Sequence, residues 1–315
     1  MRARSLLAGA MLVVIAMATI CDGCPEAVAS PGGAMSTSRD LVHTPCGPQN
    51  VRESLRPLVP LPAPHHMSAG STMARIAQRG YLAVGVLEDT YPFSVRDQRL
   101  TLQGFDIDIA RDIAAAIFGD PGRVVFRPVA EPDRIPAATS GRVDLVAAGL
   151  TVDCMRREQV DFSAVYYEAG QRILVNRGSA VTSLNDLRGR RVCAGRGTTS
   201  LTTILAAASK PVPVATSTET DCLMLLQLGE VDAVSTDDTL LAGMAAQDPR
   251  TVVVGPRFTE EPYAIAINKR TPDLVRFVNA VLEHRVKDGR WRASYERWLG
   301  LLGPAPTPPV PSYQD

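Results

Sequence analysis

Apolar residues follow two alternating spacings along the chain, which together predict an α/β fold. Short apolar runs that predict strands lie at residues 81–86, 124–127, 143–147, 191–194, 212–215 and 231–235. Segments with helical spacing lie between and after them, at residues 105–118, 200–208, 222–228, 239–246, 273–286 and 290–299. In the first of these segments apolar residues recur at four-residue spacing from Phe105 to Ile117, as on the buried face of a helix. Strands that alternate with helices are typical of α/β layering.

Two segments repeat one pattern, which predicts two similar lobes. Residues 140–151 read SGRVDLVAAGLT, and residues 228–237 read LGEVDAVSTD. Each predicts a helix that ends at a glycine, then a strand, then a polar loop, because glycine suits the left-handed end of a helix. Ligands of open α/β sheets bind outside the carboxyl ends of the strands. The polar loops at 149–151 and 236–238 are therefore expected to face each other across a ligand cleft.

The N-terminus has the pattern of an export signal. Two arginines precede an apolar run at residues 6–20, which is too short for a secure membrane span and is followed by small and polar residues. Cys21 and Cys24, at the end of this run, resemble the lipobox cysteine of bacterial lipoproteins, and either could carry the lipid. We expect a signal peptide over residues 1–24. The mature protein is expected at the outer face of the cell membrane, attached to it through a lipid anchor only.

Two stretches outside the α/β pattern are rich in proline. Residues 25–66 contain many Pro, Ser and Gly residues and few periodic apolar ones, so they are expected to act as an extracellular linker. Residues 304–315 are expected to form a second, extended tail. The folded part of the chain should lie between these two stretches.

Composition and charge argue against several classes of function. Lys plus Arg and Asp plus Glu number 33 each, so the formal net charge is zero and the basic footprint of a nucleic-acid-binding protein is missing. The chain contains no GxSxG, HExxH, GxGxxG or Walker motif. Its cysteines beyond residue 24 lack the close CxxC spacing of a zinc site. We therefore expect no cofactor, no metal and no catalytic activity.

Four cysteines remain beyond the signal region. They are Cys46, Cys154, Cys193 and Cys222. An even number of cysteines in an oxidising compartment favours structural disulfides. Four cysteines allow three pairings, and spacing alone leaves all of them open.

An ordered set of motifs resembles the polar amino-acid-binding proteins of ABC importers. The motifs are GFDIDIA at 104–110, SGRVDLVAAGLT at 140–151, RREQVDFSAVYY at 156–167, NDLRGRRV at 185–192, RGTTS at 196–200 and GEVDAV at 229–234. Together the resemblance covers about residues 81–299. The chain looks most like the glutamine-binding lipoproteins of mycobacteria and other actinobacteria. The family has the two-lobed periplasmic-binding-protein fold (type 2), so the resemblance implies two α/β lobes, a two-strand hinge and a monomer.

The resemblance also implies which residues bind the two charged ends of a free amino acid. The positions that match the carboxylate-binding ones are Arg156, Gly197, Thr198 and Thr199. A guanidinium fork and the N–H groups at the start of a helix both suit an anion. The positions that match the ammonium-binding ones are Asp237, Thr151 and Gly149. On residue type alone, the Thr and Asp residues could equally be helix caps.

Four further positions match those that surround the ligand side chain in the family. Tyr91 and Phe93 match apolar walls, although aromatic residues there are as often part of the core. Leu87 stands where glutamine-binding relatives have Asp, and Thr236 stands where some relatives have His. Because of these departures, the resemblance implies only a polar or acidic L-amino acid of the glutamine, glutamate, asparagine and aspartate class.

Boundaries and disulfides follow from the same resemblance. Lobe 1 is expected to comprise residues 67–173 plus 265–303, and lobe 2 residues 174–264, with hinge strands near 172–176 and 263–268. This division implies the disulfides Cys193–Cys222, within lobe 2, and Cys46–Cys154, between the leader and lobe 1.

The expected function is capture of a free amino acid for an ABC permease. An amino-acid sensor that signals to a membrane receptor is the alternative, because closure around a ligand presents the same signal to either partner. Cyclohexadienyl dehydratases share the fold, and this enzyme class is the less favoured reading.

Overall fold

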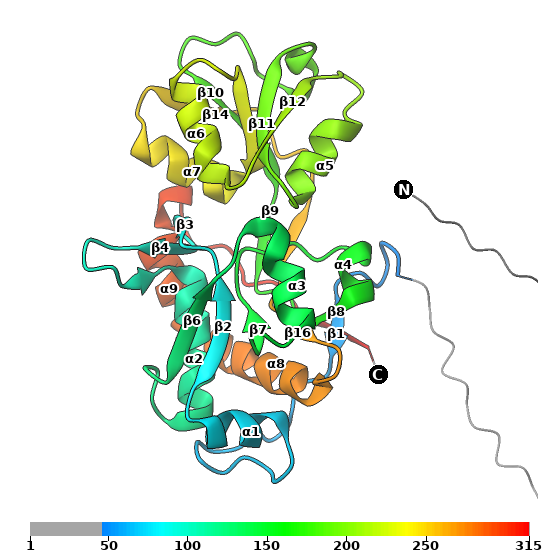
Figure 1. Cartoon of the computed structure of the whole chain (residues 1–315), viewed down its shortest axis with the longest axis vertical. Coiled ribbons are helices and arrows are strands. Elements are labelled where there is room, and N and C mark those ends of the chain that lie inside the picture. The colour runs from blue at the N-terminus through cyan, green and yellow to red at the C-terminus, as the bar shows by residue number, and fades with distance from the viewer. Residues whose placement is uncertain (1–45, 315) are drawn as a thin grey trace, which may run out of the picture. The chain divides into compact units, whose positions relative to one another are not determined.

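The computed structural model describes residues 46–314, which form two α/β lobes (Figure 1). Each lobe is built on a five-stranded sheet. The strand order is β6-β2-β7-β16-β8 in lobe 1 and β12-β11-β13-β10-β14 in lobe 2. The predicted α/β class and the two-lobed organisation are therefore confirmed.

Lobe 1 holds the first half of the folded chain and its C-terminal helices. Its strands are β2 (Leu82–Val86), β6 (Val124–Pro128), β7 (Leu145–Val146), β8 (Val160–Phe162) and β16 (Ala266–Asn268). Its helices are α1 (Thr72–Arg79), α2 (Phe105–Phe118), α3 (Arg134–Thr139), α4 (Cys154–Gln159), α8 (Pro272–Lys287) and α9 (Arg290–Trp298), with short turns η1 (Glu131–Asp133) and η3 (Gly300–Leu302). A small antiparallel sheet follows β2 and consists of β3 (Asp89–Thr90), β4 (Ser94–Arg96) and β5 (Leu102–Gln103).

Lobe 2 is one continuous segment. Its strands are β10 (Gln171–Asn176), β11 (Arg191–Gly195), β12 (Val212–Thr216), β13 (Ala233–Asp237) and β14 (Thr251–Val254). Its helices are α5 (Thr199–Ala206), α6 (Glu219–Gln227) and α7 (Asp238–Gln247), with a short turn η2 (Leu184–Leu187). β11, β12 and β13 are parallel, so their carboxyl ends lie at one edge of the sheet.

Helix α2 connects the core of lobe 1 to the cleft. It covers Phe105–Phe118, as predicted, and ends where Gly119 takes a left-handed conformation at φ 69°. Asp106, in its first turn, is fully buried. The Asp106 carboxylate accepts hydrogen bonds from the Gly149 backbone N–H at 2.7 Å and from the Tyr166 hydroxyl at 2.6 Å. The helix thereby fixes the loop that follows β7.

The lobes are joined by a two-stranded antiparallel sheet of β9 (Tyr167–Ala169) and β15 (Glu261–Tyr263). This differs from the expected crossings near 172–176 and 263–268, because those segments contain β10 and β16 of the lobe sheets. The apolar residues of β10 are needed in the core of lobe 2. Lobe 2 therefore begins at β10 and not at residue 174.

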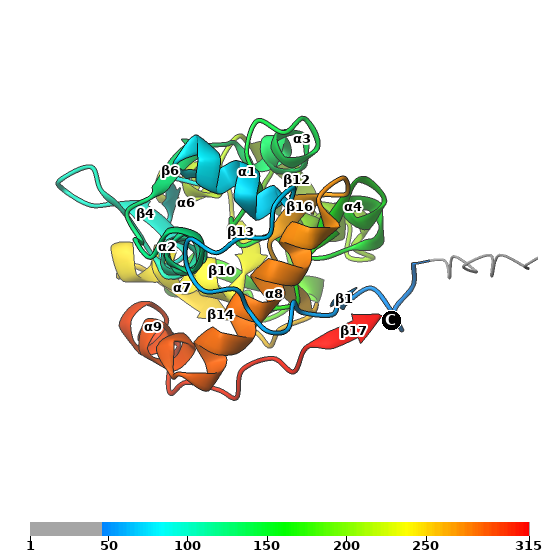
Figure 2. The ribbon, with the colours of Figure 1, turned by 90° about the horizontal axis from the view of Figure 1, so that it is seen from below.

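Residues 46–66 pack on the molecule, in contrast to the expected linker, and the extended tail packs on it as well. β1 (Glu53–Leu55) pairs in parallel with β17 (Ser312–Gln314), and Figure 2 shows this pair beside α8. The apolar side chains of the leader lie against the core of lobe 1, and these are Leu55, Leu58 and Leu61. Proline prevents helix formation in both segments but leaves strand pairing and apolar packing possible.

Both expected disulfides are confirmed. Cys46–Cys154 joins the leader to α4, and Cys193–Cys222 joins β11 to α6, each with Cα atoms 5.5 Å apart. The expected signal peptide, with Cys21 and Cys24, lies outside the described residues. Over residues 46–314, no helix is both long and apolar enough to span a membrane.

Candidate functional site

Loops from both lobes meet and enclose a small cavity, here called the cleft. Most of these loops follow the carboxyl ends of strands, where ligands of α/β sheets bind. The lining residues are Leu87, Thr90, Glu131, Arg134, Ala148, Gly149, Thr151, Arg156, Thr198, Thr199, Ser200, Glu219, Asp237 and Leu240. The cavity measures about 20 Å³, which is room for about one water molecule. The lobes must therefore part before a larger solute enters.

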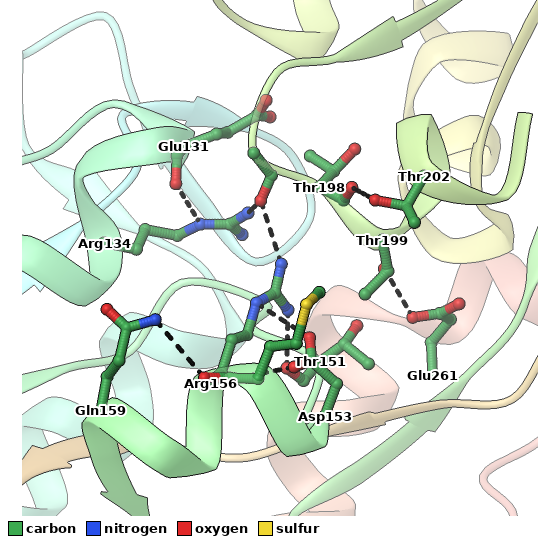
Figure 3. Close-up of polar contacts among 12 residues, drawn as sticks. Glu131, Arg134, Thr151, Asp153, Arg156, Gln159, Thr198, Thr199, Thr202 and Glu261 are labelled. Carbon is green, nitrogen blue, oxygen red and sulfur yellow. Dashed lines mark hydrogen bonds and ion pairs between the residues drawn. The ribbon is translucent and has the colours of Figure 1, made fainter. Parts of the chain in front are cut away.

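Arg156 of α4 bridges the two lobes at this cavity (Figure 3). Its guanidinium donates to the Thr151 carbonyl of lobe 1 at 2.6 Å and to the Gly197 carbonyl of lobe 2 at 3.0 Å. Asp153 caps α4 and lies 3.2 Å from the Arg156 Nε. Burial and the neighbouring Arg134 lower the pKa of Arg156 to about 10. A positive charge is therefore held at the cleft, with 9% of the residue exposed.

The loop from Gly197 to Thr199 brings lobe 2 against lobe 1. Gly197 has φ 76°, and a Cβ there would lie 2.7 Å from Cα of Pro132 in lobe 1. Only glycine permits this approach. Thr198 caps α5 by accepting from the Leu201 N–H at 3.1 Å. Thr199 donates its hydroxyl to Glu261 at 2.8 Å. The helix start thus faces the cleft, where its N–H groups favour an anion.

Asp237 supplies a buried carboxylate from the end of β13. One oxygen, Oδ2, accepts a hydrogen bond from the Tyr263 hydroxyl, whereas Oδ1 has no partner among the described residues. Burial, followed by the charges of Glu261 and Glu219, raises the pKa of Asp237 well above its usual range. A buried carboxylate oxygen without a partner is unfavourable, so this group is suited to accept from a cationic ligand group.

Glu131 and Glu219 place two more carboxylates in the cleft, one from each lobe. Each residue is 5% exposed, and Oε2 of each lacks a hydrogen-bond partner among the described residues. The other Glu219 oxygen accepts from the Thr236 hydroxyl at 2.5 Å. Burial raises the pKa of Glu131 to about 7, and burial together with the Glu131 charge raises that of Glu219 to about 8.

Arg134 of α3 is the second guanidinium of the cleft (Figure 3). It donates to three carbonyls, those of Glu131 at 2.9 Å, Ala148 at 3.2 Å and Gly197 at 3.4 Å. The Gly197 carbonyl thus accepts from both Arg134 and Arg156. This arrangement holds two positive charges close together and leaves the free oxygens of the acidic residues without a direct partner.

The structure brings most of the residues expected at the site to one cavity. Those that line it are Leu87, Gly149, Thr151, Arg156, Thr198, Thr199 and Asp237. Gly197 contacts Arg156 through its carbonyl, at the border of the cavity. Arg156 of lobe 1 and Asp237 of lobe 2 thus bring a basic and an acidic group to the same space.

Besides Gly197, three expected residues do not line the cavity. Phe93 lies in the aromatic core of lobe 1, with its ring centroid 5.3 Å from that of Tyr263. The Tyr91 carbonyl packs against Gly243 of α7, where a Cβ would lie 2.3 Å away. Thr236 is fully buried, and its hydroxyl contacts two lining residues, since it donates to Glu219 and accepts from Ser200 at 3.4 Å. These side chains serve packing and positioning, which their residue types also allowed.

The sequence interpretation missed several lining residues. They are Thr90, Glu131, Arg134, Ala148, Ser200, Glu219 and Leu240. Glu131 and Glu219 follow the predicted strands at 124–127 and 212–215, so the rule that ligands bind at carboxyl strand ends could have found them. No comparable signal identifies Arg134, because a buried arginine depends on the surrounding carbonyls.

Two α/β lobes, a two-stranded connection and a cleft at the strand ends define a two-lobed solute-binding protein. Comparison with known families agrees. The family of bacterial extracellular solute-binding proteins, family 3, matches residues 82–301, and the chain belongs to this family.

Individual relatives cover most of the same region. An ABC transporter glutamine-binding protein of Bacillus subtilis is 36% identical over 234 residues, which is 74% of this chain and 86% of the relative. A glutamine-binding protein of Geobacillus stearothermophilus is 37% identical over 65% of this chain and 79% of its own length. An ancestral arginine-binding protein, solved with arginine and with glutamine, is 37% identical over 70% of this chain and 99% of its own, with a TM-score of 0.66.

Proposed function

We propose that this protein captures a free L-α-amino acid in the cleft and delivers it to an ABC importer. The observation that carries the proposal is the pairing of Arg156 from lobe 1 with Asp237 from lobe 2 at one buried cavity. An α-amino acid presents a carboxylate and an ammonium a fixed distance apart. Arg156 and the N–H groups at the start of α5 suit the carboxylate, and the free oxygen of Asp237 suits the ammonium.

The named ligands of the relatives support an amino acid and leave its side chain open. Two relatives are glutamine-binding proteins, one of them from an ABC transporter, and the ancestral protein is solved with both arginine and glutamine. Proteins similar to this chain therefore bind amino acids with different side chains. Family membership therefore supports a ligand with the α-carboxylate and α-ammonium that all amino acids share.

A thermal-shift and calorimetry panel of the common L-amino acids tests this function. A ligand at 100 times its Kd stabilises the folded protein by about 2.7 kcal/mol, which raises the Tm by several degrees. Matched analogues give the control. The amine that lacks the α-carboxylate and the N-acetyl form that lacks the ammonium should each fail to bind. If no amino acid raises the Tm of the folded protein, this function is wrong.

The family consists of solute-binding proteins, which supports binding without catalysis in this cleft. Incubation with prephenate or arogenate, followed by absorbance, should show no conversion above the rate without protein. Conversion of either compound above that rate would favour the cyclohexadienyl dehydratase hypothesis.

We also propose that the protein is exported, monomeric and lipid-anchored through Cys21 or Cys24, which lie outside the described residues. The apolar run before these cysteines and the extracellular family support this. Replacing both cysteines with serine should move the protein from the membrane fraction to the soluble fraction, whereas Cys24→Ser alone tests which one carries the lipid. Retention of the double variant in the membrane would exclude the anchor.

A further inference from the structure

One end of the cleft gathers acidic side chains that an amino acid with a neutral side chain would leave without a cationic partner. Glu131 and Glu219 both line the cavity, both are 5% exposed, and each has an oxygen without a hydrogen-bond partner among the described residues. Glu131 reaches across to lobe 2, where a Cβ on Gly195 would lie 2.0 Å from its Oε2 and 2.8 Å from the Glu219 Cγ. The two acidic side chains therefore meet at one place between the lobes.

The residues proposed for the two charged ends of the ligand share the cavity with this acidic pair. Arg156 interacts with the charges of Asp153, Glu261 and Asp237. Arg134 and Asp89 are charged neighbours of both Glu131 and Glu219, and Asp237 is a further neighbour of Glu131. Asp237 is also a charged neighbour of Glu219. With the ligand carboxylate at Arg156 and the ammonium at Asp237, Glu131 and Glu219 are the acidic groups of the same cavity that remain for the ligand side chain.

Acidic side chains outnumber basic ones in the lining of the cavity. Three acids (Glu131, Glu219 and Asp237) face two guanidiniums (Arg134 and Arg156), and burial raises the pKa of all three acids, so they can be ionised together only when a cation compensates them. The α-carboxylate and α-ammonium of a ligand cancel each other. Buried charge without compensation is strongly unfavourable. Arg134 donates no hydrogen bond to the unpartnered carboxylate oxygens, because its hydrogen bonds go to backbone carbonyls.

We propose that Glu131 and Glu219 form the subsite for the ligand side chain and select a basic L-amino acid, one that carries a guanidinium or an ammonium on its side chain. This inference rests on the proposed function and names its ligand class. A single positive charge on the side chain neutralises the cleft and gives hydrogen-bond donors to both free oxygens. A guanidinium matches paired carboxylates especially well, since its donors lie in a planar fork.

The proposed ligand class, basic amino acids, differs from the class expected from the sequence, which was glutamine, glutamate, asparagine and aspartate. A glutamate or aspartate side chain would add a fourth carboxylate beside Glu131 and Glu219. A glutamine or asparagine amide could donate hydrogen bonds but would leave the negative charge in place. The resemblance to glutamine-binding proteins could not show this, because the acidic pair lies outside the motifs that carry it.

Calorimetry with L-arginine, L-lysine, L-ornithine, L-glutamine and L-glutamate tests the subsite. We expect at least one basic ligand to bind tenfold or more tightly than glutamine, and glutamate to bind most weakly. In Glu219→Gln and Glu131→Gln, which keep the side-chain shape, the preference for the basic ligand over glutamine should fall by about thirtyfold, as for loss of one partner of a buried charge pair. The control is Glu230→Gln, the same change at an exposed residue of lobe 2, which should keep the parental preference.

The outcomes separate this inference from the proposed function. Circular dichroism and thermal melting first establish that each variant is folded. If glutamine or glutamate binds the parent protein and no basic amino acid does, the basic subsite is wrong while the amino-acid function stands. If the glutamine variants keep the full preference for a basic ligand, the assignment to Glu131 and Glu219 is wrong. If no amino acid of any class binds, the proposed function itself fails.

Discussion

Arg156 and Arg134 converge on one acceptor, the carbonyl of Gly197. Two guanidiniums on one neutral oxygen repel each other, and Arg134 is among the causes that lower the pKa of Arg156. A ligand carboxylate between them would replace a neutral acceptor with a charged one. Charge-assisted hydrogen bonds are about twice as strong as neutral ones. The residue geometry thus favours an anion at this point of the cleft.

Arg156→Ala should weaken binding of every amino acid by about thirtyfold or more, because truncation leaves the α-carboxylate buried without its partner. Arg156→Lys should also bind poorly, since a point charge does not reproduce a bidentate fork. Calorimetry measures both effects. Arg142→Ala, at an exposed arginine of the same lobe, is the matched control and should bind as the parent does. Parental affinity in a folded Arg156→Ala protein would exclude this position from the site.

Asp237→Asn keeps the shape of the side chain and an acceptor for Tyr263 but removes the charge. All amino acids should lose affinity together, by about thirtyfold, because the α-ammonium is common to them. The neighbouring change Thr236→Val gives a contrast. Its hydroxyl donates to Glu219, so this variant should alter the ranking of ligands by side chain. Equal effects of the two variants on every ligand would contradict the assigned roles.

At the scale of the element, the disulfide Cys46–Cys154 fixes the leader on α4, the helix that carries Arg156. The Cys46→Ser/Cys154→Ser variant should lower the free energy of unfolding by about 2–4 kcal/mol, measured by denaturant titration. The loss should exceed that of Cys193→Ser/Cys222→Ser by about 1 kcal/mol, since the cross-link spans 108 residues against 29. An equal or smaller loss would show that the leader adds little to the fold.

The elements that could be predicted from sequence are those with a long apolar periodicity. Helix α2 has its predicted bounds, and β2 and β6 lie within a residue of the expected ones. The parallel pair β1–β17 could not be predicted, because its partners are about 260 residues apart and each is a short, proline-flanked segment. Local pattern says nothing about which remote strand completes the hydrogen bonds of another.

The residues of the candidate site could likewise be predicted only in part. Arg156 and Asp237 were expected because family motifs surround them, and both line the cavity. Phe93 was expected at the ligand, because an aromatic residue after a strand can either line a ligand site or pack in a core. In the structure its ring packs against Tyr263 in the core. Glu131 and Glu219 belong to the site only through the approach of two lobes. Such an approach is a property of the whole molecule.

At the scale of the whole molecule, closure brings like charges together. Glu131 of lobe 1 meets Glu219 of lobe 2, with Asp89, Asp237 and Arg134 as the charged groups around them. Hydrogen bonds such as Arg156 to Gly197 hold the lobes closed. Without a ligand, closure therefore depends on how far these carboxyl groups are protonated. The lobes are joined by the β9–β15 connection.

The ligand-free protein should open as the pH rises. The pKa of Glu131 is raised to about 7 and that of Glu219 to about 8 in the closed form, mainly by burial. Opening exposes both groups and returns their pKa values toward 4.5. A group whose pKa is higher in the closed form binds protons more readily there, so protonation favours closure and deprotonation favours opening. The change should therefore occur between about pH 5 and pH 8.

Small-angle scattering of the ligand-free protein between pH 5 and pH 8.5 measures this change as an increase in radius of gyration. Glu131→Gln/Glu219→Gln should remain compact across the range, because amides carry no charge, whereas Glu230→Gln should behave as the parent. A saturating basic amino acid should restore the compact form at pH 8.5, since its side chain compensates the carboxylates. A radius that stays constant with pH in the parent protein, with binding and compaction by ligand both demonstrated, would show that these carboxylates do not control closure.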